Sequence, residues 1–135
     1  MSIKDCKLVI IPTFSDLRGD LSVIEDTIIP FKIKRIFYLY NQPNNSKRGG
    51  HAHKECEQFI ITLSGSFIVN IDDGLEKQQY ELHSPNIGLY INPMVWVDVF
   101  NLHTHDVCLA LTSDYFNESD YIRNYSDFLK TVGVK

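Results

Sequence analysis

The chain has 135 residues, enough for one domain and too few for two ordinary ones, so we expect a single domain over residues 1–135. Its 17 acidic residues outnumber its 13 basic ones, and the net charge of −4 argues against nucleic acid as a partner. No stretch approaches the roughly 18 consecutive apolar residues of a membrane helix, so we expect no membrane partner. The three cysteines, Cys6, Cys56 and Cys108, are widely spaced and indicate reduced thiols in a cytoplasmic protein.

Short runs of strand-forming residues recur along the whole chain. Ile, Val, Phe, Tyr and Thr dominate these runs, and turn residues such as Gly, Pro, Asn and Asp separate them. The expected strands are 7–11, 20–25, 33–40, 57–63, 66–71, 78–82, 88–91, 95–100 and 107–112. One helix is expected, over about 118–132, with Asn117 or Ser119 as its N-cap. Many short strands at close spacing predict a β-sandwich or a β-barrel.

The segment from Arg48 to Gln58 carries the most unusual chemistry of the chain. His51 and His53 are two residues apart, so both point to one face of a strand, and Glu57 has the same parity. The pair has three interpretations: structural histidines, a metal site completed by a carboxylate, or metal-free acid–base catalysis near neutral pH. The residues of this segment alone leave all three open.

Two segments resemble the paired motifs of the cupins. Residues 49–57, Gly-Gly-His-Ala-His-x-x-x-Glu, are similar to the first motif, and residues 88–96 are similar to the second. The second cupin motif normally supplies one more metal-binding histidine. Trp96, Val97 and Asp98 stand near that place here, which favours a site without a metal ion.

Nearly the whole chain resembles a more specific family, the WxcM-like sugar-nucleotide 3,4-ketoisomerases. The similar segments are 16–21, 29–38, 48–54, 72–74, 88–96 and 113–125. The resemblance implies an all-β fold, the double-stranded β-helix or cupin jelly roll, followed here by the short C-terminal helix. It also implies no metal and no organic cofactor, and a homodimer that exchanges N-terminal strand contacts. The apolar run 7–11 fits this implication, because it needs a sheet edge to pair with.

The family acts on a dTDP-linked 4-keto-6-deoxy sugar and moves the carbonyl group from C4 to C3 through an enediol. On this resemblance, His51 and His53 are the acid–base pair. Tyr38 orients a sugar hydroxyl or donates to the enediolate. The resemblance places this chemistry in the biosynthesis of dTDP-3-amino-3,6-dideoxyhexoses, and the sequence leaves open the C4 configuration of the product and the division of roles between the histidines.

The remaining candidates contact the rest of the substrate. Arg35 and Arg48 are predicted to bind the diphosphate, since the planar guanidinium matches phosphate oxygens. Arg18 is predicted to reach the sugar or the partner's site. Trp96 and Tyr90 are predicted to wall the sugar pocket, with core packing as the alternative. We further expect Glu57 to orient a histidine and Arg123 to be structural.

Other functions remain compatible with these residues. A 3,5-epimerase of similar substrates would use the same histidines, because it also removes a proton next to a ketone. A metal-dependent cupin dioxygenase would need bound iron. A non-catalytic sugar-nucleotide-binding cupin would bind dTDP-sugars without turning them over.

Overall fold

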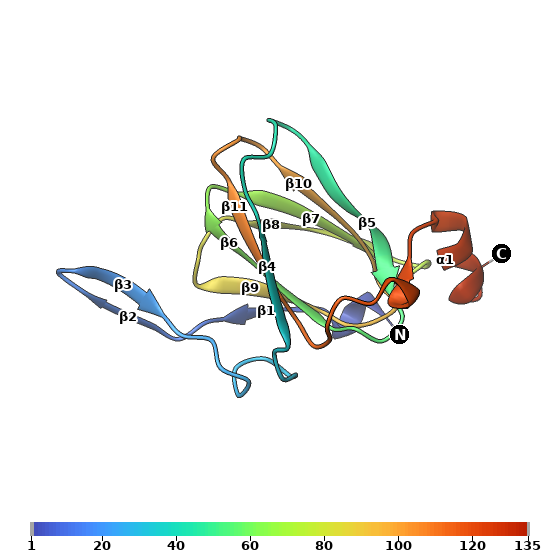
Figure 1. Cartoon of the computed structure of the whole chain (residues 1–135), viewed down its shortest axis with the longest axis horizontal. Coiled ribbons are helices and arrows are strands. Elements are labelled where there is room, and N and C mark those ends of the chain that lie inside the picture. Colours follow the sequence, from blue (N-terminus) through green and yellow to red (C-terminus); the bar gives the residue numbers. More distant parts are fainter. Residues whose placement is uncertain (1, 135) are drawn as a thin grey trace.

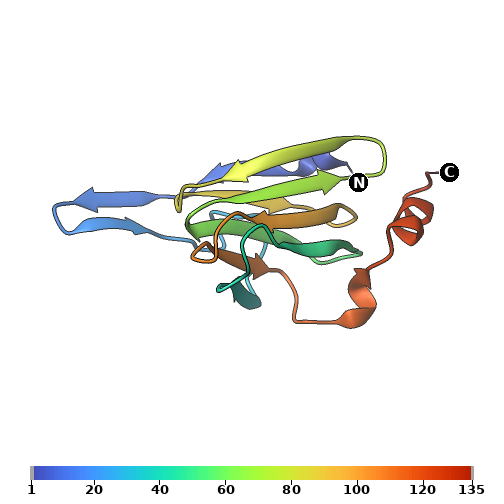
Figure 2. The ribbon, with the colours of Figure 1, turned by 90° about the horizontal axis from the view of Figure 1, so that it is seen from above.

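A computed structural model describes residues 2–134, and it consists mainly of two antiparallel sheets packed face to face (Figures 1 and 2). In spatial order, the first sheet contains β1 (Lys7–Ile10), β9 (Ile87–Ile91), β6 (Gln58–Ser64), β11 (Val107–Thr112) and β4 (Arg35–Leu39). The second contains β12 (Tyr121–Ile122), β5 (Lys47–His53), β10 (Trp96–Asn101), β7 (Phe67–Asp72) and β8 (Lys77–Leu82). Neighbouring strands are mostly distant in sequence, as in a jelly roll, and the all-β prediction is confirmed.

The main core lies between the two sheets. Alternating residues of β7 and β10 point inward, among them Val69, Ile71, Val97 and Val99, and meet apolar side chains of the first sheet such as Leu89. This alternation is the period-two pattern of a strand with one buried face.

Strand β6 departs from the alternation, because its first five residues are all buried. Its second face packs beneath the segment that precedes β4. Ile29 and Phe31 of that segment cover Phe59 and Ile61. A strand that is covered on both faces reads as a continuous apolar run.

Strands β2 (Thr13–Asp16) and β3 (Gly19–Ser22) form a separate hairpin. It projects from one end of the sandwich, opposite the end that carries the C-terminal helix (Figures 1 and 2). The sequence predicted a strand over 20–25 and none over 13–16. The strand over 13–16 was therefore missed; all residues of both hairpin strands are exposed, so no buried face marks either of them.

The expected helix over 118–132 is divided into three elements. A 3₁₀ turn, η2 (Glu118–Asp120), is followed by β12 and then by α1 (Tyr125–Thr131). Tyr121 and Ile122 pair with His53 and Ala52 of β5, and this tertiary pairing replaces the first helical turns. Asn117 caps η2, whereas the side chain of Asn124 accepts the first N–H bond of α1.

The N-terminal segment finds its sheet edge within its own chain. After the 3₁₀ turn η1 (Ile3–Asp5), β1 pairs with β9 from Lys7↔Tyr90 to Ile10↔Ile87. None of the helices described between residues 2 and 134 has the length and apolar character needed to cross a membrane.

Candidate active site

A glycine pair brings the two-histidine segment of β5 against β10. The register between these strands shifts between Val97 and Asp98, where His51 lies opposite Val97. Gly49 and Gly50 have φ angles of 90° and 73°, and a Cβ at Gly49 would lie 2.6 Å from the carbonyl oxygen of Val97. Glycine therefore permits both the backbone conformation and the close approach that place His51 at the cavity.

A cavity of about 420 Å³ opens between the two sheets beside His51. Aliphatic and aromatic side chains from four strands line much of its wall: Phe37, Leu39, Ile60, Val97, Val99 and Ala110. The polar lining is concentrated on a few side chains: Arg35, Lys47, Arg48, His51, Gln58, Tyr121 and Arg123. A hollow that combines an apolar wall with convergent polar groups is typical of a small-molecule site.

His51, His53 and Tyr121 form a compact aromatic group. The two imidazole rings lie 5.1 Å apart between centroids, edge to face, and the Tyr121 ring lies 4.9 Å from His51 and 4.3 Å from His53. His51 lines the cavity, while His53 lies beside it and is 5% exposed. The two side chains predicted as an acid–base pair therefore do meet at one place.

The protonation of the two histidines is set by their surroundings. Burial lowers the pKa of His51 to about 4, and the neighbouring His53 and Arg123 act in the same direction. Burial also lowers the pKa of His53, but Asp120 opposes this effect through a hydrogen bond and its negative charge. His51 is consequently neutral at pH 7 and able to accept a proton.

Three arginines surround the cavity. The guanidinium carbon of Arg35 lies 4.7 Å from the Phe37 ring centroid, and that of Arg123 lies 4.2 Å from the Tyr121 ring centroid. Arg48 also lines the cavity, and neither Arg35 nor Arg48 forms an ion pair with any residue between 2 and 134. Arg123 was expected to be structural, yet it lies at the cavity, where Glu118 holds its Nε and Nη2 at 2.6 and 2.8 Å.

Tyr38 is not brought to this cavity. Arg35, Phe37 and Leu39 of β4 line the cavity, so Tyr38, which has the opposite parity, lies on the outer face. There it is 59% exposed and stacks on Tyr40 at 5.7 Å.

Trp96, Tyr90 and Arg18 also lie away from the cavity. Trp96 packs against Tyr125 and Phe128 on the other face of β10, beside a separate groove of about 610 Å³. Tyr90 is buried in the first sheet, so for both aromatics the geometry favours packing over contact with a substrate. Arg18 lies at the tip of the projecting hairpin, where it pairs with Asp16 and its side chain is 90% exposed.

Glu57 does not orient a histidine, because its Oε1 accepts the hydroxyl of Tyr90. Asp120 takes that place, with its Oδ2 3.0 Å from Nδ1 of His53. Sequence reasoning missed both Asp120 and Tyr121. The predicted helix over 118–132 did not place these two residues near the histidines, although the segment 113–125 that resembles the family includes both.

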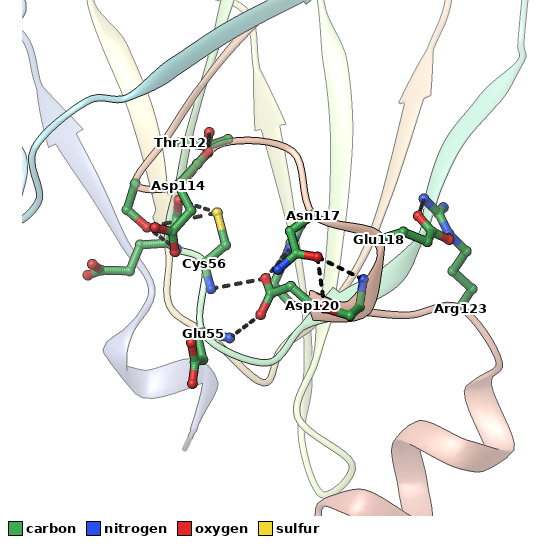
Figure 3. A network of polar contacts seen from close by, with 12 residues as sticks. Glu55, Cys56, Thr112, Asp114, Asn117, Glu118, Asp120 and Arg123 are labelled. Carbon is green, nitrogen blue, oxygen red and sulfur yellow. Dashed lines mark hydrogen bonds and ion pairs between the residues drawn. The ribbon is translucent and has the colours of Figure 1, made fainter.

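His53, Cys56 and Asp120 form a group whose potential ligand atoms lie within 4.8 Å of one another. A metal ion there would have to compete with existing hydrogen bonds, since both carboxylate oxygens of Asp120 already accept backbone N–H groups (Figure 3). The donor set therefore fits a hydrogen-bonded network better than a metal centre.

Comparison with known proteins identifies the family. The family model for the WxcM-like, C-terminal domain (FdtA) matches residues 4–133, and the chain belongs to this family. A relative from Aneurinibacillus thermoaerophilus, a TDP-4-oxo-6-deoxy-alpha-D-glucose-3,4-oxoisomerase, is 43% identical over 118 residues, covering 87% of this chain and 85% of that protein.

Two solved structures agree with this assignment. A 3,4-ketoisomerase from Helicobacter canadensis is 40% identical, with a TM-score of 0.91 over 95% of this chain and 97% of the other. A mutant of the 3,4-ketoisomerase QdtA from Thermoanaerobacterium thermosaccharolyticum, in complex with TDP-4-keto-6-deoxyglucose, is 36% identical. Its TM-score is 0.92, over 95% of this chain and 94% of the other. The cupin-type jelly roll that the sequence predicted is thereby confirmed.

Proposed function

We propose that this protein is a dTDP-4-keto-6-deoxyglucose 3,4-ketoisomerase that acts in the biosynthesis of dTDP-3-amino-3,6-dideoxyhexoses. The observation that carries the proposal is a neutral histidine, His51, at the wall of a cavity surrounded by three arginines. The relatives described above, which are 36–43% identical over most of the chain, are a 3,4-oxoisomerase and two 3,4-ketoisomerases, and they support the same reaction.

The reaction needs a group that carries a proton from carbon to carbon. The C4 ketone acidifies the proton on C3, and a neutral imidazole can accept that proton as the C3–C4 double bond forms. We assign this step to His51, because it lines the cavity and is uncharged at pH 7. The same imidazolium then returns a proton to C4.

A second proton moves between the two oxygens. The C3 hydroxyl loses it as the new C3 carbonyl forms, and the former C4 carbonyl oxygen gains it. We assign this transfer to His53, which lies beside His51 in the aromatic group. Tyr121, whose ring contacts both histidines and Arg123, is the further candidate, since its hydroxyl could donate to the enediolate.

Arg35, Arg48 and Arg123 are assigned to the dTDP diphosphate. Their positive charge at one cavity supports binding of an anion, and the planar guanidinium groups can donate two parallel hydrogen bonds to phosphate oxygens. Aromatic rings support two of the three guanidinium groups, which limits their freedom before the ligand arrives.

A homodimer is the proposed assembly, and a second copy is the proposed partner of the β2–β3 hairpin. Phe14 and Leu21 lie opposite each other on this hairpin and are 67% and 58% exposed, while Leu17 at the tip is fully exposed. Side chains of this kind are stabilised by a protein surface that covers them. In such a dimer, Arg18 at the hairpin tip is the residue proposed to approach the partner's site.

The three free cysteines, Cys6, Cys56 and Cys108, are all buried. Buried, unpaired thiols support the proposal that the enzyme works in the reducing cytoplasm.

The test is to identify the product by NMR. Purified protein is incubated with dTDP-4-keto-6-deoxyglucose and a dTDP-3-keto-sugar aminotransferase, which traps the labile 3-ketone as a 3-amino sugar. We expect a 3-amino product, whose H4 coupling constants also give the C4 configuration. Inversion at C5 without a 3-keto product would indicate a 3,5-epimerase, and tight binding without turnover would indicate a binding protein. Loss of turnover in EDTA, restored by one divalent metal ion, would contradict the metal-free reaction.

A further inference from the structure

Asp120 is the carboxylate that contacts the histidine pair. Its Oδ2 lies 3.0 Å from Nδ1 of His53. The same oxygen accepts the backbone N–H of Cys56 at 3.2 Å, and Oδ1 accepts that of Glu55 at 2.8 Å (Figure 3). Its side chain is 15% exposed. Because two backbone amides hold the carboxylate, its orientation is set independently of the imidazole that it meets.

This contact determines which nitrogen of His53 carries the proton. An ionised carboxylate can only accept hydrogen bonds, so Nδ1 of a neutral His53 must be the donor, and Nε2 is left with the free lone pair. His51 has no equivalent partner, because its buried Nδ1 makes no hydrogen bond with residues 2–134. Of the two histidines on this strand face, only His53 therefore has a carboxylate hydrogen-bonded to its ring.

We propose that Asp120 is a positioning residue for the ketoisomerase reaction: it holds His53 as the Nδ1–H tautomer, so that Nε2 exchanges the proton that moves between the substrate oxygens. This inference rests on the proposed function and deepens it. As Nε2 accepts the proton, the imidazolium gains a charged hydrogen bond to Asp120. The proton leaves again from Nε2 to the other oxygen, and Nδ1 keeps its own proton throughout.

The charges around His53 make this partner necessary. The titratable or charged groups that face it are His51, Cys56, Asp120, Tyr121, Arg35 and Arg123. Arg35 and Arg123 both disfavour a positive charge on His53, and burial disfavours it further, while Asp120 favours it. Removing the negative charge of Asp120 therefore leaves an imidazole that is harder to protonate.

The first test reads the tautomer directly, on protein labelled with ¹⁵N-histidine at pH 7.5. Long-range ¹H–¹⁵N correlations distinguish Nδ1–H from Nε2–H, and His53→Asn identifies the signal. In the wild type we expect His53 to be protonated at Nδ1, and a spectrum showing Nε2–H would overturn the proposal. This reading needs no substrate, no turnover and no Asp120 variant, so it stands whether or not the proposed reaction occurs.

The second test is Asp120→Asn, which keeps the size of the side chain but places an amide beside His53. Asp114→Asn is the matched control, because it removes a carboxylate from the same connection, where Asp114 Oδ1 lies 3.7 Å from Nζ of exposed Lys34 (Figure 3 labels Asp114 and Asp120). For Asp120→Asn we expect part or all of the His53 population to shift to Nε2–H. We also expect kcat to fall at least tenfold, and at most about 10⁴-fold, with little change in dTDP affinity. The control is expected to behave as the wild type.

The pH profile separates positioning from a purely structural role. In Asp120→Asn, the acidic inflection of kcat is expected to move to lower pH, because His53 loses its anionic partner. A variant that is merely less stable would lose active protein without moving that inflection or the tautomer signal. A folded Asp120→Asn protein with an unchanged tautomer, inflection and kcat would overturn the proposal. Absence of turnover in the wild type, with the expected tautomer present, would instead contradict the proposed function.

Discussion

His51 and His53 are identical side chains, two residues apart on one strand, and their surroundings make them chemically different. His51 lines the cavity, is half-buried beside Arg123 and another imidazole, and has its pKa lowered to about 4. In His53, Nδ1 lies 3.0 Å from the carboxylate of Asp120. Pairs of titratable groups whose surroundings separate their pKa values are the basis for assigning acid and base roles. This asymmetry supports His51 as the base for the carbon-bound proton.

The corresponding prediction concerns His51→Asn, which keeps a similar size but removes the titratable nitrogen. We expect turnover to fall by about 10²–10⁴-fold, the usual contribution of positioned acid–base catalysis. Binding of dTDP, measured by calorimetry, should change little, because the diphosphate is assigned to the arginines. His83→Asn is the control, since His83 is exposed in the connection between β8 and β9. Turnover near the wild-type value in His51→Asn would contradict the assignment.

Tyr38 gives a second prediction at this scale. Its sequence position made it a candidate catalytic residue, but its place on the outer face of β4 predicts that the hydroxyl is dispensable. We expect Tyr38→Phe to keep kcat within about twofold, as surface changes usually have small effects. Tyr121→Phe, which removes the hydroxyl from the ring that contacts both histidines, is expected to lower kcat instead. The reverse ranking of the two variants in a steady-state assay would restore Tyr38 to the site.

The sequence predicted which residues share a face of a strand better than it predicted which face of each strand lies at the cavity. Spacing alone indicated that His51 and His53 share a face, and Arg35 and Arg48, the two arginines predicted to bind the diphosphate, both line the cavity. Tyr38 and Trp96 do not, because moving one residue along a strand exchanges the cavity face for the opposite one. Whether the odd-numbered or the even-numbered residues of a strand point inward depends on how the two sheets pack, and the sequence of a single strand does not determine it.

At the scale of elements, the connection after β11 shows a different limit of sequence reasoning. Tyr121 and Tyr125 are four residues apart, a spacing that fits a helix. In the structure, Tyr121 instead pairs with His53 of the neighbouring strand β5, and this pairing outweighs the local preference for a helix. Asp120 and Tyr121 reach the histidines through this long-range pairing, so local pattern could not identify them.

The β2–β3 hairpin gives the prediction that belongs to this scale. Phe14 and Leu21 are exposed within one chain, so Phe14→Ser/Leu21→Ser should leave the fold intact and weaken a dimer that covers them. We expect sedimentation velocity at micromolar concentration to give a dimer for the wild type and a shift toward monomer for the double variant. Ser15→Ala/Asp20→Ala alters the opposite face of the hairpin and is the matched control. A monomeric wild type would contradict the proposed assembly.

At the scale of the whole molecule, the site is expected to make stability depend on pH. An unfolded histidine has its ordinary pKa of 6.5, whereas folding lowers the pKa of His51 to about 4. Between these values the unfolded chain binds a proton that the native site resists. The free energy of unfolding should therefore fall as the pH decreases from about 6.5 toward 4. His53 adds in the same direction, since its pKa is also lowered.

The prediction is that His51→Asn flattens this dependence. One proton bound only by the unfolded state contributes a slope of about 1.4 kcal/mol per pH unit. Between pH 6 and pH 4.5, the slope of the variant should be lower than that of the wild type by up to this value. Urea unfolding at pH 7.5, 6.0, 5.0 and 4.5 measures the slope, with constant m-values as the check on two-state behaviour. His83→Asn should keep the wild-type slope, because its side chain is exposed in the native state as well. Parallel curves for the wild type and His51→Asn would show that His51 becomes charged in the native protein as readily as in the unfolded chain. In that case His51 would not be the neutral base that the proposed reaction requires.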